Sequence, residues 1–154
     1  MTSDLWTFAL RLYAQPGVEA ACLHLQDRGA DVCLLLTACW LGRRGVSFEE
    51  PRLRALADRC GPWQERVVKP LRALRQGWRE AAREDPALDG LREQIKALEV
   101  EAERKLLARL ESAADGWGAN HGEQLEAWLQ GSFPVREEVD RDALECLRGA
   151  ALAL

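Results

Sequence analysis

Residues 31–43, Asp-Val-Cys-Leu-Leu-Leu-Thr-Ala-Cys-Trp-Leu-Gly-Arg, decide the fold class of this chain. Wound as a helix, this segment is apolar on nearly every side, and such a helix belongs at the centre of a helical protein. Asp31 is suited to cap its first turn, because an aspartate side chain accepts hydrogen bonds from the free N–H groups there. We therefore predict a buried central helix over about 31–43.

The segment before this helix is predicted to form two further helices. Ser3 is placed to cap the first of them. Pro16 and Gly17 interrupt its apolar pattern, so a second helix is expected from Pro16 to about Arg28. The N-terminal 43 residues thus predict three helices with short connections.

After the central helix, Ser47 to Glu50 read as a capping box, and a helix is predicted from there to about Gly61. Another is expected from Pro62 to about Asp85. Pro70 lies inside it and cannot donate a backbone hydrogen bond, so we expect a kink or a break at that point.

A long helix is predicted over about 91–114, followed by a short one over about 123–130 and a last one running to the C-terminus. The apolar stripe of the long helix is expected at Leu91, Ile95, Leu98, Ala102, Leu106, Leu110 and Ala113, with Glu99 on another face. The sequence has no sustained alternating strand pattern and no Asn-Gly or Asp-Gly turn between apolar runs. The fold class predicted is all-α, a compact bundle of six to eight helices.

Length and charge indicate one domain whose two halves differ. The 154 residues suit a single helical domain over 1–154. The N-terminal half, about 1–85, is apolar and frequently interrupted by proline and glycine. The C-terminal half, about 86–154, carries fourteen acidic and eight basic residues. Whether the halves share one core is left open.

Composition favours a cytoplasmic protein. The net charge is −4, and the longest uncharged run, residues 32–42, is too short to span a membrane. No secretory signal pattern is present at the N-terminus. The five cysteines, with no Cys-x-x-Cys pair, are expected to be reduced thiols. Neither a cofactor nor a metal is expected, because no known ligand-binding or catalytic motif occurs.

The first candidate site is a small-molecule site made of His24, Gln26, Asp27 and Asp31. An imidazole beside carboxylates can bind ligands or transfer protons. The alternative is structural, since Asp27 ends one helix and Asp31 caps the next. A pairing of Asp27 with Arg11 or Arg28 would make the group a structural lock, whereas a pocket over it would make it the best ligand site in the chain.

The second candidate is a basic helix face between residues 66 and 83. Its members recur at three- and four-residue steps, which places them on one side of a helix: Lys69, Arg72, Arg75 (or Gln76), Arg79 and Arg83, with Arg66 extending the face. Such a face can contact a partner protein or the phosphates of RNA. Nucleic acid is disfavoured by the negative net charge, and a solvated helix face is the alternative.

Two further features point to partners. Trp117 lies between glycines in a loop, where it can cover the core from outside or act as a contact residue. The narrow stripe of the long helix can pack within the chain or against a second copy, which leaves a homodimer as an alternative.

The N-terminal half resembles a known family of bacterial proteins. The segments that carry the resemblance are residues 6–10, 13–18, 21–27 and 31–36, closing on Trp40-Leu41. The family comprises uncharacterised proteobacterial proteins of about this length. The resemblance implies a bacterial cytosolic protein, and it implies nothing about chemistry.

The sequence therefore predicts a non-enzymatic protein-interaction module, acting through the basic helix or through the acidic C-terminal half. No catalytic residue is assigned. One alternative is a small-molecule-binding protein or small enzyme using the Asp27 and Asp31 region. The other is association with RNA or the ribosome through the basic face around 66–83.

Overall fold

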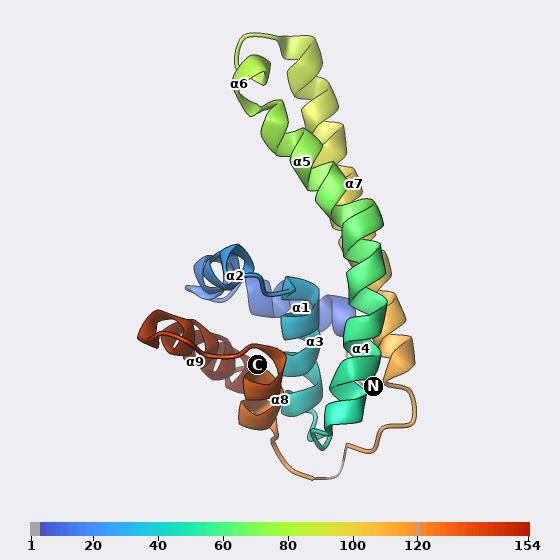
Figure 1. Ribbon diagram of the computed structural model, residues 1–154, viewed down its shortest axis with the longest axis vertical. Coiled ribbons are helices and arrows are strands. Elements are labelled where there is room, and N and C mark those ends of the chain that lie inside the picture. Colours follow the sequence, from blue (N-terminus) through green and yellow to red (C-terminus); the bar gives the residue numbers. More distant parts are fainter. Residues whose placement is uncertain (1–3, 120) are drawn as a thin grey trace.

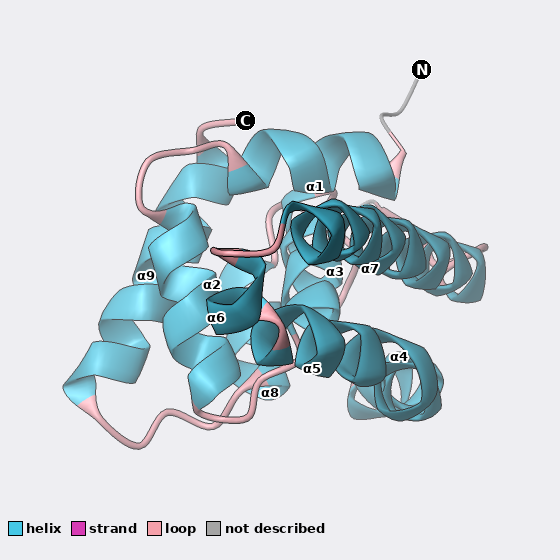
Figure 2. Cartoon of the chain, turned by 90° about the horizontal axis from the view of Figure 1, so that it is seen from above, coloured by secondary structure: helices cyan, strands magenta, loops and turns pink. Residues whose placement is uncertain are grey.

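The computed structural model describes residues 4–119 and 121–154, and within those ranges it consists of helices and loops (Figure 2). The elements are α1 (Leu5–Tyr13), α2 (Val18–Asp27), α3 (Val32–Arg43), α4 (Glu50–Trp63), a π-helical turn η1 (Gln64–Val68), α5 (Lys69–Gly77), α6 (Arg79–Ala82), α7 (Pro86–Ala113), α8 (Leu125–Ser132) and α9 (Glu138–Leu152). The predicted all-α fold class is confirmed.

The central helix is α3, as the sequence predicts. Every residue from Cys33 to Gly42 is buried, and the Asp31 side chain caps the helix by accepting from the Leu34 N–H at 3.1 Å. Gly42 lets α8 approach closely, since a Cβ atom there would lie 2.7 Å from the Cα of Leu125. The absence of a side chain at this position therefore sets how α3 and α8 pack.

Both halves of the sequence contribute to one hydrophobic core. It joins buried residues of α1 to α4 with those of the second half of α7 and of α8 and α9. Trp128 of α8 is fully buried, and its indole N–H donates to the Val46 carbonyl oxygen at 2.8 Å. We call these packed elements the body.

A helical hairpin extends from the body. The chain leaves through α4, η1, α5 and α6, and it returns through α7 (Figure 1). The backbones of α5 and α6 lie close only to α7, to each other and, for α5, to η1. We call residues 69–100 the arm, because they project beyond the helices of the body, with α1, α2 and α9 on one side of the hairpin (Figure 2).

The two prolines of the outgoing chain have different effects from those predicted. The helix boundary expected at Gly61-Pro62 is wrong, because α4 continues through Pro62 to Trp63. Pro70 instead coincides with an irregularity, the π turn, in which the Lys69 N–H donates to the Gln64 carbonyl five residues back. A wider turn separates a proline ring from the carbonyl it would otherwise meet.

Several helix starts also differ from the sequence prediction. Ser3 lies outside the described residues, and Asp4 caps α1 by accepting from the Thr7 N–H at 2.6 Å. The Ser47 capping box is wrong, because α4 begins at Glu50 and the Ser47 carbonyl accepts from Arg52 instead. The long helix α7 begins at Pro86, before the expected start, because Asp85 caps it.

The stripe expected along α7 is partly wrong. Leu91 and Leu98 are 50% and 54% exposed, whereas Glu99 is buried at 7% exposure. The buried side of the helix passes through Glu99 because α5 supplies charged partners at that level.

Although α7 has 28 residues, no helix in the described ranges is long and apolar enough to cross a membrane.

Candidate functional site

Two adjoining pockets lie where the arm leaves the body. The larger has a volume of about 450 Å³ and the smaller about 280 Å³. We call them together the inner cleft. Its apolar and aromatic wall includes Trp6, Leu10, Tyr13, Leu23, Val32 and Leu36. The residues that line both pockets are Gln26, Val32, Cys33, Arg72 and Glu103. The cleft therefore joins side chains from α2 and α3 with others from the hairpin.

A buried ion network lies on the arm side of the cleft. The Glu99 carboxylate accepts from Arg75 Nε at 2.6 Å and from Arg72 Nε at 3.2 Å. Its hydrogen bond also raises the pKa of Arg75. A buried carboxylate needs such partners to stay charged. The network thus fixes α5 to α7.

Arg72 also reaches across the cleft to the body. With the amide of Gln26 oriented so that its oxygen faces the guanidinium, Gln26 accepts from both terminal nitrogens of Arg72, at 2.9 Å from Nη2. One side chain of the arm therefore contacts α2 and α7 together. This contact makes Arg72 the main polar link between the two walls of the cleft.

Asp31 stands at the opposite end of the cleft, where the α2–α3 loop meets the π turn. Gln64 Nε2 donates to its Oδ1 at 3.3 Å, in addition to the cap on Leu34. Burial raises the pKa of Asp31, although hydrogen bonds from Leu34 and Cys33 N–H and from Cys60 act against this. Among the ion pairs of the described residues, none involves Asp31. Its carboxyl is thus held by neutral donors.

Glu103 is the carboxyl with the most unusual environment in the cleft. Burial, together with the nearby charge of Glu99, raises its pKa to about 7. It makes no side-chain hydrogen bond or ion pair within the part of the chain that the structure describes. Burial also raises the pKa of Tyr13 to about 12. Glu103 can therefore gain or lose a proton near neutral pH while facing a partly apolar pocket.

The thiols near the cleft are poor nucleophiles. Burial raises the pKa of Cys33 well above its usual value, and burial beside Asp31 does the same for Cys60. A thiol needs its thiolate form to attack or to bind a metal. No cluster of three or more potential metal ligands occurs in residues 4–119 and 121–154.

The four predicted ligand residues separate into two places. Gln26 and Asp31 line the inner cleft. His24 Nε2 instead lies 3.1 Å from Oδ1 of Asp140, and Asp27 is exposed without an ion pair among the described residues. Of the two alternatives left open by the sequence, the pairing of Asp27 with Arg11 or Arg28 is not found among the described residues.

The lock that does exist centres on Asp140, which the sequence analysis did not identify. Its buried carboxylate forms an ion pair with Arg28, whose Nε lies 2.6 Å from Oδ1. It is also hydrogen-bonded to His24 and accepts from the N–H groups of Arg136 and Glu137. Burial acts to raise the pKa of Asp140, but these hydrogen bonds and the Arg28 charge hold it below its usual value. The lock joins α2 to α9, more than 110 residues apart in sequence.

The predicted basic face is largely neutralised. Lys69 pairs with Glu65, Arg83 with Glu80 at 3.5 Å, and Arg72 and Arg75 with Glu99. Arg66 and Arg79 are exposed, and neither forms an ion pair with a described residue. Only part of the expected stripe therefore presents free positive charge.

Trp117 lies against the body. Its ring stacks on Trp128 with centroids 6.4 Å apart, and the Arg52 guanidinium stands 5.1 Å from its centroid. The side chain is half-buried and covers α8 from outside.

Glu99 and Glu103, which sequence reasoning did not select, were detectable only as carboxylates one turn apart beside an apolar stripe.

Comparison with known proteins identifies one family. The family described as "Protein of unknown function (DUF2390)" matches residues 4–110. The match takes in α1 to α6 and nearly all of α7, so Gln26, Asp31, Arg72, Glu99 and Glu103 lie inside it. The resemblance of the N-terminal part to an uncharacterised family is thereby confirmed. No curated protein and no solved structure matches the chain.

Proposed function

We propose that this chain, which belongs to the family described as "Protein of unknown function (DUF2390)", is a non-enzymatic protein-interaction module that presents its arm to a partner protein. The observation that carries the proposal is the projection of the arm from the body (Figure 1), together with the apolar side chains that are exposed on it. The family match covers the whole arm. The arm therefore lies within the matched part of the chain.

Exposed apolar side chains are concentrated on the arm. Leu74, Leu91, Leu98 and Val100 are each at least 42% exposed, and they make up half of the eight large apolar side chains exposed in the described residues. Leu91 and Leu98 are seven residues apart, so they lie on the same side of α7. Grouped exposed apolar residues mark interaction sites, whereas scattered ones do not.

The arm adds little to the core of the protein. No residue of α5 is buried, and the Glu99 network holds this helix to α7. A segment that folds back without a core of its own presents nearly all of its side chains outward. That property suits a docking element and not a purely structural one.

Site-specific photo-crosslinking in the native cells tests this proposal. A photoreactive residue at Leu98 is expected to capture one discrete protein, and Leu91→Glu is expected to reduce the capture at least tenfold. Val139 on α9 is the matched control, because it is 52% exposed on the body. Equal capture at both positions, or none at Leu98, would contradict the proposal. Capture of a second copy would identify a homodimer, and loss on nuclease treatment would indicate RNA.

A second candidate function is the binding of a small molecule in the inner cleft. The observation that favours it is the pocket of about 450 Å³, in which Glu103 lacks a partner among the described residues and faces Tyr13 and Leu10. A ligand with an apolar body and one polar group fits these walls.

Ligand-observed NMR with small aromatic and amine compounds tests this second candidate. Leu10→Trp should fill the cleft and abolish binding, and Val139→Trp, at a similarly exposed position, should not. The candidate fails if no compound distinguishes these two variants.

Association with RNA through the basic face has less support. The pairing of Lys69, Arg72 and Arg83 with carboxylates removes much of the free charge that phosphate binding needs. The net charge of −4 acts in the same direction.

A further inference from the structure

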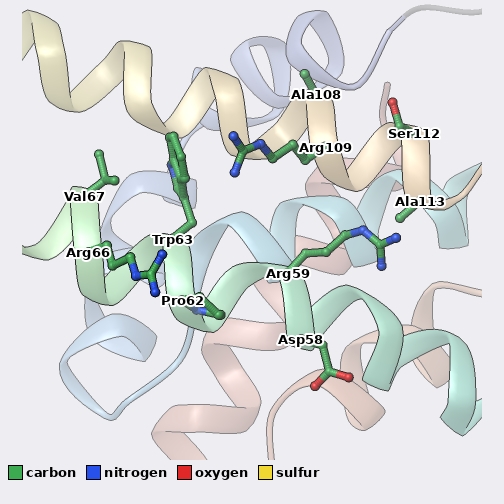
Figure 3. Close-up of a pocket in the computed structure, with 10 residues that line it drawn as sticks. All are labelled: Asp58, Arg59, Pro62, Trp63, Arg66, Val67, Ala108, Arg109, Ser112 and Ala113. Carbon is green, nitrogen blue, oxygen red and sulfur yellow. The ribbon is translucent and has the colours of Figure 1, made fainter.

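We infer that a groove between α4 and α7 receives an acidic segment of the partner protein. The groove has a volume of about 790 Å³ and shares no lining residue with the inner cleft. It runs along the stem of the hairpin, where α4 and η1 face the second half of α7 (Figure 3). The inference rests on the proposed function and adds the chemistry of the partner. We call this site the arginine groove.

Three arginines without carboxylate partners line the groove. Arg59 and Arg66 come from α4 and η1, and Arg109 comes from α7 (Figure 3). All three are exposed, and none forms an ion pair with a described residue. Asp58 is the only acidic residue in the lining. Guanidinium groups bind carboxylates in a planar two-pronged geometry, so this lining is complementary to aspartate and glutamate side chains.

The other basic side chains of the hairpin are of two kinds. Seven of them each lie within 4 Å of a carboxylate oxygen: Arg52, Lys69, Arg72, Arg75, Arg83, Lys96 and Lys105. Arg54, Arg79, Arg92 and Arg104 form no ion pair with a described residue, but they do not line the groove. The chain as a whole has more acidic than basic residues. Three unpaired arginines around one groove therefore form a local positive surface in a negatively charged protein.

The floor of the groove is rigid and apolar. The Trp63 indole N–H donates to the Ala102 carbonyl at 2.8 Å, and the Arg109 guanidinium lies 4.1 Å from the centroid of its ring. Figure 3 shows these two side chains approaching each other from opposite helices, with Pro62 and Val67 nearby. Tryptophan and arginine held in place in this way are the residue types that dominate protein–protein binding energy.

The groove lies on the same side of α7 as the exposed leucines of the arm. Leu98 and Arg109 are eleven residues apart, which is close to three helical turns, so both point to the same side of α7. They are separated by about 17 Å along the helix axis, at roughly 1.5 Å per residue. Leu91 lies on that side as well. A partner segment with apolar residues against Leu91 and Leu98 would place its next turns over the arginines.

An acidic protein segment fits this site better than RNA does. One face of the Trp63 ring is already covered by Arg109, which removes a stacking surface for a base. The exposed Leu91 and Leu98, farther along the same side of α7, offer nothing to a phosphate backbone. The positive charge is confined to three side chains and does not extend along a face.

Binding of a defined peptide to the full-length chain tests the inference. The probe is a fluorescein-labelled helical peptide with leucines seven residues apart followed by a glutamate-rich turn, and its anisotropy is measured at low and at moderate salt. We expect binding that weakens with salt and falls at least tenfold in Arg59→Glu/Arg66→Glu, a variant that keeps the Arg109–Trp63 contact. Arg79→Glu, at an exposed arm position, is the matched control and should bind normally.

Three results would overturn the inference: equal binding by the reversal and control variants, equal binding of a lysine-rich peptide, or tighter binding of a single-stranded RNA at the same arginines. Circular dichroism establishes that the variants keep their helices. Because this test uses purified components, it is separate from the crosslinking test. If capture at Leu98 is unchanged by the arginine reversals, the arginine groove is not the binding site, but the proposed function still holds.

Discussion

In the body, α3 buries every residue from Cys33 to Gly42, whereas in the arm α5 buries none. Between residues 69 and 100 the buried residues are Ala82 and Glu99, and one of these is a carboxylate. The body is thus stabilised by removal of apolar surface from water, and the arm by a small ion network. Under the proposed function, the chain separates the part that supplies the core from the part that is presented to a partner.

The largest expected effect is a loss of core packing in the body. Leu41→Ala, at a fully buried position of α3, should lower the free energy of unfolding by about 2–5 kcal/mol. Leu98→Ala on the arm should change it by less than about 0.5 kcal/mol. Urea denaturation measures both. Similar losses in the two variants would contradict the division into body and arm.

Glycine replacements should have opposite signs in the two regions. Gly42→Ala would place a Cβ 2.7 Å from the Leu125 backbone and should cost about 3 kcal/mol, at the upper end of overpacking effects. Gly90→Ala in α7 meets nothing within 4 Å and should stabilise by about 0.5–1 kcal/mol. Thermal unfolding of both variants measures the two changes in stability. A change of the same sign in both variants would contradict this prediction.

Removing the buried charge should loosen the arm and leave the body unchanged. Glu99→Gln keeps the shape of the side chain but leaves Arg72 and Arg75 without a carboxylate, at a local cost of about 1–3 kcal/mol. Hydrogen exchange should accelerate in α5 and α6 and stay constant in α3 and α8. Glu93→Gln, which breaks an exposed pair with Lys96, is the control. Uniform acceleration across the chain would mean that arm and body unfold together.

The smallest expected effect is a dependence of stability on pH at the junction of the two regions. The pKa of Glu103 is about 7 in the folded protein against 4.5 when unperturbed, because of burial and the charge of Glu99. Folded Glu103 therefore keeps its proton where the unfolded chain has lost it. Its contribution is fully present below pH 4.5 and is lost as the pH rises to about 7.

The comparison of wild type with Glu103→Gln isolates this contribution. The wild-type free energy of unfolding should fall by on the order of 1 kcal/mol more than that of the variant between pH 4.5 and pH 7.5. Asp140 in the body has the opposite behaviour, since its lowered pKa gives stability that is lost in acid. A difference between wild type and variant that does not change with pH would contradict the assignment.

The sequence was informative where local patterns determine the structure. The apolar run of α3 and the Asp31 cap could be predicted because burial and capping depend on neighbouring residues. Gln26 and Asp31, which the sequence suggested as candidate ligand residues, line a pocket that depends on the arm, and their role in binding stays a prediction. His24 could not be assigned, because its partner Asp140 is 116 residues away.

The arm could not be predicted because its pattern has two interpretations. Arg72 and Arg75 at helical spacing look like a solvated face, and only the position of α7 shows that Glu99 neutralises them. The wrong prediction that Leu98 is buried and Glu99 exposed has the same cause. A helical period of 3.6 residues does not decide which of two neighbouring positions is buried where contacts with distant residues determine it.

Deletion of the arm tests the central claim most directly. A variant in which a short glycine–serine linker replaces residues 69–100 should unfold cooperatively, because the core residues of the body lie outside that range. It should also lose the partner that the full chain captures in native cells. A deletion variant that fails to fold, or that retains the partner, would contradict the account of a folded body presenting a docking arm.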